Sequence, residues 1–179
     1  AIESANRILM ETNCDAVKLE GGKDMAPAVE SMVKAGISVV GHIGLTPQTS
    51  VSFGGFKVQG GTPESAVALI EDAKALEAAG AIGIVVECVP SVVAKAMTEA
   101  VSIPIMGIGA GPDVDAQVMV TQDLLGMYGD FKPKFVKHFA NIREEMIKGL
   151  NEFHTESLSG AFPTPEFSFN KAIELPRVY

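Results

Sequence analysis

Glu87 is the residue of this sequence whose position most clearly predicts chemistry. It stands in the run Ile-Gly-Ile-Val-Val-Glu-Cys-Val at 82–89, where most neighbouring side chains are apolar. A carboxylate that is buried without a partner is costly, and loss of water favours the form that holds a proton. A carboxylate in such surroundings accepts a proton better than an exposed one does. We therefore interpret Glu87 as a candidate general base, whereas a purely structural acid here would need a partner.

Lys18 and Glu20 form a second candidate, because they are two residues apart in an expected strand and so leave the same face of it. In one interpretation they are an ion pair at a strand end. In the other, Glu20, which precedes Gly21 and Gly22, gives a carboxylate oxygen to a hard divalent cation while Lys18 binds an anionic substrate group. Mg²⁺ fits the second interpretation, because it takes few protein ligands and leaves positions for a substrate.

His42 lies among glycines at the end of another expected strand. It could be a ligand, a hydrogen-bonding group that orients a neighbour, or a buried structural histidine. The glycine-rich stretch at 107–111 is not followed by the Gly-Lys-Ser/Thr of a phosphate-binding loop, and its glycine spacing differs from the dinucleotide-binding pattern. We interpret it as a backbone turn that lines the site.

Alternating helices and strands must position these residues. Apolar strands are expected at 15–22, 37–44, 81–89 and 103–111, with a short one at 116–121, and helices at 1–13, 26–35, 62–79 and 91–100. Near-continuous apolar strands between helices are typical of parallel α/β folds, whose sites lie at the carboxyl ends of the strands. The pattern predicts an α/β fold but does not decide between a barrel and an open doubly wound sheet.

The pattern changes near residue 131. A helix is expected there that contains Phe135, Phe139, Ile142, Met146 and Leu150, followed by a tail rich in proline and phenylalanine at 162–179. No independent domain is indicated, so residues 1–179 are expected to form a single domain. The aromatic side chains of the tail are expected to pack on the same domain or on a neighbouring subunit.

The composition narrows the possible partners. The 179 residues are 47% hydrophobic and 20% charged, as in ordinary globular domains, and carry a net charge of −8. This charge repels phosphate backbones and anionic lipids, so we expect neither nucleic acid nor a membrane as partner. No membrane span or leader is recognised, which favours a cytoplasmic protein. Cys14 and Cys88 lack CxxC spacing and are expected to be reduced thiols.

Five motifs in order resemble the ketopantoate hydroxymethyltransferase family. They occupy residues 17–22, 41–48, 55–60, 86–90 and 103–111. The resemblance runs from about residue 1 to 127 and resumes weakly in the tail. It implies a (β/α)8 TIM barrel, of which this chain would hold strands four to eight, in a superfamily of magnesium enzymes that act on 2-oxo acids.

The resemblance also implies roles for the four candidates. Glu20 would be a ligand or near-ligand of Mg²⁺, Lys18 a contact to the 2-oxo acid, His42 a neighbour that assists substrate or folate, and Glu87 the general base. The implied reaction transfers a hydroxymethyl group from 5,10-methylenetetrahydrofolate to 3-methyl-2-oxobutanoate, giving 2-dehydropantoate, in a homodecamer. In that family two further metal-binding aspartates lie on the first three strands, one of them in an Asp-Ser-Leu-Gly motif. This sequence contains no Asp-Ser pair.

Two alternatives remain open. One is a magnesium-dependent lyase of 2-oxo acids, of the isocitrate lyase and phosphoenolpyruvate mutase group, although a Lys-Lys-Cys-Gly-His loop that would favour it is absent from the sequence. The other is an inactive barrel fragment. A barrel without its first three strands would expose strand edges and apolar surface, so the 179-residue chain by itself is expected to be poorly soluble.

Overall fold

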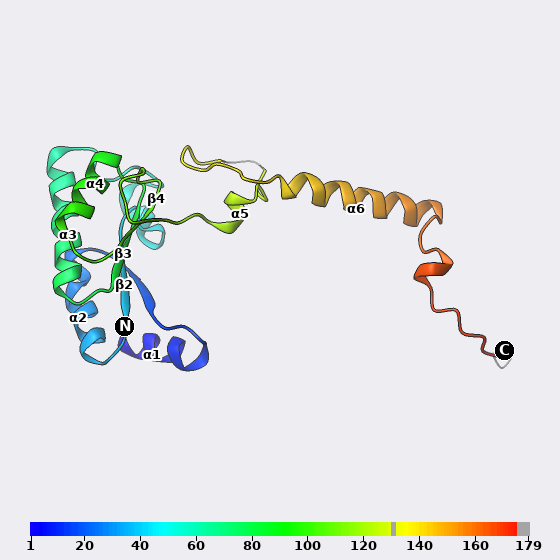
Figure 1. The fold of residues 1–179 in the computed structure, drawn as a ribbon, viewed down its shortest axis with the longest axis horizontal. Coiled ribbons are helices and arrows are strands. Elements are labelled where there is room, and N and C mark those ends of the chain that lie inside the picture. Colours follow the sequence, from blue (N-terminus) through cyan, green and yellow to red (C-terminus); the bar gives the residue numbers. More distant parts are fainter. Residues whose placement is uncertain (130–131, 175–179) are drawn as a thin grey trace. The chain divides into compact units, whose positions relative to one another are not determined.

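The computed structural model describes residues 1–129 and 132–174 (Figure 1). They divide into two compact units, residues 1–119 and residues 120–179. The first unit holds the whole sheet and all four candidate residues. The single domain expected for 1–179 stays a prediction. No helix in the described part of the chain is both long and apolar enough to cross a membrane.

The first unit is a parallel sheet with its connecting helices. Its elements are α1 (Ile2–Glu11), β1 (Val17–Glu20), η1 (Lys23–Met25), α2 (Ala26–Lys34), β2 (Val39–Gly44), η2 (Pro47–Phe53), α3 (Pro63–Ala78), β3 (Gly83–Glu87), α4 (Ser91–Ala100), β4 (Ile105–Ile108) and β5 (Ala116–Gln117). The strand order is β1-β2-β3-β4-β5 and every neighbouring pair is parallel. The predicted α/β class is therefore confirmed. A doubly wound sheet reverses its strand order at a switch point, and this sheet has no reversal, which is consistent with part of a (β/α) barrel.

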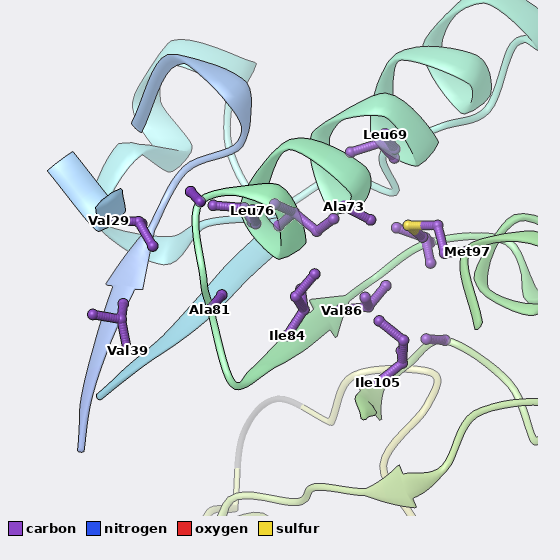
Figure 2. Packing of buried hydrophobic residues seen from close by; sticks show 14 of the residues in the cluster. Val29, Val39, Leu69, Ala73, Leu76, Ala81, Ile84, Val86, Met97 and Ile105 are labelled. Carbon is purple, nitrogen blue, oxygen red and sulfur yellow. The ribbon is translucent and has the colours of Figure 1, made fainter. Parts of the chain in front are cut away.

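One face of the sheet packs against the helices (Figure 2). On this face Val39, Ile84, Val86 and Ile105 of the strands are fully buried and join the core side chains of α2, α3 and α4. The labelled members of this layer are Val29, Val39, Leu69, Ala73, Leu76, Ala81, Ile84, Val86, Met97 and Ile105. Gly41 lies on the same face, where an added Cβ would come within 2.8 Å of Leu76 Cδ1. The apolar core therefore lies between the sheet and the helices.

The other face carries the remaining residues of the strand alternation, because successive side chains of a strand point to opposite sides. Val40, Val85 and Met106 on this face are only half-buried, and Lys18 is exposed. This face is better covered near the carboxyl ends of the strands, where the His42 side chain is fully buried. The face opposite the helices is thus partly open, and it is the face that carries the four candidate residues.

The start of α3 confirms a local prediction. The sequence Thr-Pro-Glu-Ser at 62–65 predicts a helix start, with Thr62 as the cap and Pro63 at the first helical position. The Thr62 hydroxyl accepts a hydrogen bond from the Ser65 backbone N–H at 3.2 Å, and the Ser65 hydroxyl accepts one from the Thr62 backbone N–H at 3.0 Å. Two of the otherwise unpaired backbone donors at a helix start are satisfied in this way.

The second unit corrects the prediction for the region after residue 131. It contains α5 (Thr121–Leu124), α6 (Ile142–Ser159) and η3 (Pro165–Phe167). Phe135 and Phe139 precede α6, so the prediction that they belong to this helix was wrong. The Phe139 and Ile142 backbone N–H groups donate to Leu124 and Leu125 carbonyls at 2.8 Å and 3.0 Å. Because these two N–H groups bond to carbonyls outside α6, they do not form the bonds within the helix that an earlier start would require.

The expected strands were also longer than those observed, and the one at 116–121 is reduced to Ala116–Gln117. In the tail, the Phe162 ring lies 5.7 Å from that of Phe153 in α6 and 5.8 Å from that of Phe167, measured between ring centroids. The aromatic tail thus packs at least partly on its own unit.

Leu76→Ala should destabilise the protein by about 2–5 kcal/mol, because it leaves a cavity in a fully buried part of the core. Val67→Ala in the same helix is the control, since Val67 is 60% exposed, and its effect should stay within about 0.5 kcal/mol. The measurement is urea unfolding of the full-length protein. Equal effects of the two substitutions would contradict the described core.

Candidate active site

The register of three neighbouring strands brings the predicted site residues together. Glu20 of β1 pairs with His42 of β2, and Glu87 of β3 pairs with Gly44, two residues further along β2. Lys18 lies two residues before Glu20 on the same face. All four predicted residues therefore lie on one face of the sheet, three of them near the carboxyl ends of their strands.

His42 lies at the centre of this group. Its Nδ1 is 3.3 Å from Lys18 Nζ and 3.5 Å from Glu20 Oε1, and its Nε2 is 3.2 Å from Glu87 Oε2. The side chains of His42, Glu20 and Glu87 are 1%, 9% and 15% exposed. Two carboxylates and an ammonium group thus surround a buried imidazole.

The Lys18 contact indicates which imidazole nitrogen carries the proton. An ammonium group only donates hydrogen bonds, so Nδ1 of His42 must accept, and a neutral ring then carries its proton on Nε2. Nε2 lies 3.2 Å from Glu87 Oε2 but has no hydrogen-bond partner among the described residues. An unpaired buried donor is costly. The site therefore holds a donor that a bound molecule could satisfy.

Glu20 is held by a loop that sequence reasoning did not identify. The Gln48 backbone N–H, in η2, donates to Glu20 Oε2 at 3.1 Å. The other carboxylate oxygen, Oε1, is the one that faces His42. Gln48 was missed because it acts through its backbone, and no residue type marks such a contact in a sequence.

The backbone at Glu87 is fixed from β2. The Leu45 N–H donates to the Glu87 carbonyl at 2.8 Å. Gly44 has a φ of 88°, and a Cβ at this position would overlap the Glu87 carbonyl oxygen. Only glycine combines this positive φ with such a close approach. Gly44 therefore allows β2 and β3 to meet at the point where Glu87 enters the site.

Cys88 fixes the other side of Glu87. Its φ of 51° is the only positive value at a non-glycine residue in the described part of the chain, and such strained residues cluster at functional sites. Its N–H donates to the Ile108 carbonyl and its own carbonyl accepts from the Gln59 N–H, both at 2.9 Å. Burial and, secondly, the negative charge of Glu87 raise the pKa of the Cys88 thiol to about 11.

The donor set fits a magnesium ion only in part. Within residues 1–129 and 132–174, no group of three or more His, Cys, Asp or Glu side chains is arranged to hold a metal ion. Glu20 can offer Oε1, and Mg²⁺ is commonly held by one or two carboxylates together with water and substrate oxygens. One ligand of such a shell could therefore come from Glu20.

The glycine-rich stretch at 107–111 covers the end of β4 and the bend at 109–110 that follows it. An added Cβ on Gly111 would overlap Ser91 at the start of α4, and Gln117 Nε2 donates to the Gly111 carbonyl at 2.9 Å. Close packing against α4 explains the need for glycine here without a bound phosphate.

Residues 1–165 match the model of a family described as ketopantoate hydroxymethyltransferase. The 3-methyl-2-oxobutanoate hydroxymethyltransferase of Heliobacterium modesticaldum is 53% identical over 179 residues, which are 100% of this chain and 65% of that protein. The proteins of the same name from Clostridioides difficile and Enterococcus faecalis are 51% and 50% identical, over 100% and 94% of this chain and 66% and 62% of their own lengths. The chain thus spans about 65% of the first of these relatives.

Gly44→Ala should destabilise the protein by about 2–5 kcal/mol, since the substitution adds an overlap with the Glu87 carbonyl to the cost of a positive φ. Gly36→Ala is the matched control, because Gly36 has a φ of 83° and nothing within 4 Å of an added Cβ. It should cost only about 1–2 kcal/mol. Chemical denaturation of both variants measures the difference, and no difference would argue against the close approach at Gly44.

Iodoacetamide at pH 8 should modify Cys14 long before Cys88 in the folded protein. Cys14 is exposed, whereas a pKa of about 11 leaves roughly one Cys88 thiol in a thousand ionised at this pH. Glu87→Gln removes one cause of the raised pKa and should accelerate modification of Cys88. Mass spectrometry of tryptic peptides measures both rates. Equal modification of the two cysteines would contradict the surroundings described for Cys88.

Proposed function

Because the chain belongs to the ketopantoate hydroxymethyltransferase family, we propose that it supplies the proton-abstracting part of a 3-methyl-2-oxobutanoate hydroxymethyltransferase. The observation that carries this proposal is the group of Lys18, Glu20, His42 and Glu87 on one face of the sheet. A cationic anchor, a carboxylate that can bind a metal ion and a largely buried base are what removal of a proton next to a 2-oxo group requires.

The proposed reaction adds one carbon to 3-methyl-2-oxobutanoate. The C3–H bond breaks, the proton passes to Glu87, and the electron pair is shared with the 2-oxo group. The two bonds from the methylene carbon of 5,10-methylenetetrahydrofolate to its nitrogens break, with water supplying the oxygen and the two protons that remain on the nitrogens of tetrahydrofolate. C3 forms its new bond to this carbon, and the resulting alkoxide takes the proton from Glu87. The products are therefore 2-dehydropantoate and tetrahydrofolate. No oxidant or reductant is needed.

Lys18 and His42 are proposed to bind and orient the 2-oxo acid. Lys18 is exposed on the face that carries the site, so its ammonium group can reach the substrate carboxylate while keeping its contact to His42 Nδ1. His42 would offer its unpaired Nε2–H to an oxygen of the substrate or of folate. This bond would also satisfy a buried donor, which favours the bound state.

Glu20 is proposed as the magnesium ligand. The Gln48 N–H holds one carboxylate oxygen and leaves Oε1 toward the site. A Mg²⁺ ion bound there together with the 2-oxo acid would draw electrons from the 2-oxo group and make the C3–H bond more acidic. Glu87 lies on the far side of His42 from Glu20, so proton removal and metal binding use separate carboxylates.

The wider assembly is also a proposal. We infer a closed (β/α)8 barrel in which these strands are the fourth to eighth, because the parallel order is unreversed and the face with Val40, Val85 and Met106 is only half covered. Strands supplied by the rest of a barrel would bury this face. A cytoplasmic homodecamer is the assembly that family membership favours.

Glu87→Gln should abolish magnesium-dependent exchange of the C3 proton of 3-methyl-2-oxobutanoate in deuterated water, because an amide cannot accept the proton. We expect a loss of about 10²–10⁴-fold, the usual contribution of a general base. The control is Glu99→Gln, at an exposed position on α4, which should exchange normally. Proton NMR of the full-length protein with substrate measures the rate. Exchange that survives in Glu87→Gln would rule out Glu87 as the base.

A further inference from the structure

The turn that follows Glu20 is made of glycines yet is closely held. Gly21 has a φ of 125°, and its N–H donates to the His42 carbonyl at 2.9 Å. The Met25 N–H donates to the Gly22 carbonyl at 2.9 Å. Glycines have more backbone freedom than other residues, so a Glu-Gly-Gly segment needs such anchors if Glu20 is to keep one position.

One side chain from a distant element also holds this turn. Asp72, on α3, accepts a hydrogen bond from the Lys23 backbone N–H at 2.9 Å through its Oδ1, across 49 residues of sequence. Among the described residues it is the only side chain that hydrogen-bonds to the backbone of 21–25. Lys23 begins η1, so the carboxylate satisfies a backbone donor that the short helix leaves unpaired.

Gly22 and Asp72 fit each other as a pair. A Cβ at Gly22 would overlap the carboxyl group of Asp72. Asp72 is half-buried, next to Ala73 of the fully buried stripe of α3, so its backbone is fixed by the core. A side chain at position 22 would compete with the Asp72 carboxylate for the same space.

We propose that Asp72 is a positioning residue for Glu20 and so sets the affinity of the site for Mg²⁺. The carboxylate fixes Lys23, which fixes the turn and with it the end of β1 that carries Glu20. This inference rests on the proposed role of Glu20 as a magnesium ligand. Asp72 itself lies on the helix side of the sheet and touches neither metal nor substrate.

The experiment is a calorimetric titration of the full-length protein with Mg²⁺ alone. Asp72→Ala should weaken Mg²⁺ binding about 10-fold, at the low end of the effect of residues that support a metal ligand. Asp72→Asn keeps an oxygen acceptor for the Lys23 N–H and should bind within about twofold of the unmodified protein. Glu71→Ala is the matched control. It removes the same charge from the neighbouring position of α3, where the exposed Glu71 carboxylate pairs with Lys74, and should leave binding unchanged.

Kinetics separate positioning from a general loss of structure. With saturating Mg²⁺, the rate of C3 proton exchange in Asp72→Ala should return to within about twofold of normal, because Glu87 and Lys18 are not held by this turn. A protein that was merely less stable would lose active molecules without a change in Mg²⁺ affinity.

Lys23→Pro tests the same hydrogen bond by removing its donor. It keeps the proposal testable if Asp72→Ala does not fold. Proline removes the N–H and is tolerated at a first helical position. The variant should show the same 10-fold weaker binding, and adding Asp72→Ala to it should weaken binding little further, since the bond is already lost.

Unchanged Mg²⁺ affinity in both Asp72→Ala and Lys23→Pro, or equal weakening by Glu71→Ala, would overturn the role of Asp72. A different result would overturn the proposed function itself. This result would be that the unmodified protein binds Mg²⁺ and that Glu20→Gln binds it equally well. The two failures are therefore distinguishable.

Discussion

The parallel pairing of β1, β2 and β3 is the constraint on which the site depends. It sets Glu20 beside His42 and Glu87 beside Gly44. Because side chains alternate along a strand, a shift of one residue in any pair would move the polar residues to the helix face and core residues such as Ile84 to the open face. Burial of the apolar layer therefore fixes the register, and the register places the chemical groups. The alternation of side chains along the strands thus produces both the apolar core and the polar site.

The site itself contributes little to stability. Buried charges lose their hydration, and even paired ones are weak evidence of stabilisation. Here a buried imidazole lies among two carboxylates and an ammonium group, and one of its nitrogens has no hydrogen-bond partner among the described residues. Cys88 adds a strained backbone conformation next to Glu87. The helix-covered core must offset these costs, which is the usual division between a stable framework and a strained functional site.

The sequence was informative wherever a local pattern expressed a physical need. Polar residues late in apolar strands identified Glu20, His42 and Glu87, and the pair Thr62-Pro63 marked the start of α3. Contacts made by backbone groups, or between residues far apart in the sequence, leave no local pattern of this kind. Gln48 and Asp72 were therefore missed. The C-terminal helix was placed too early because apolar spacing does not reveal that the Phe139 and Ile142 N–H groups bond to the carbonyls of Leu124 and Leu125, where α5 ends.

Helix α3 contacts both the apolar core and the turn that follows β1. Leu69, Ala73 and Leu76 hold it against the sheet, and Asp72, beside that stripe, reaches the turn after β1. The position of the carboxylate is thus set by core packing rather than by the site. Since interiors are closely packed and shift little, a helix held in this way can keep the turn after Glu20 in one position better than a loop could. The same packing that stabilises the sheet then determines how firmly Glu20 is presented.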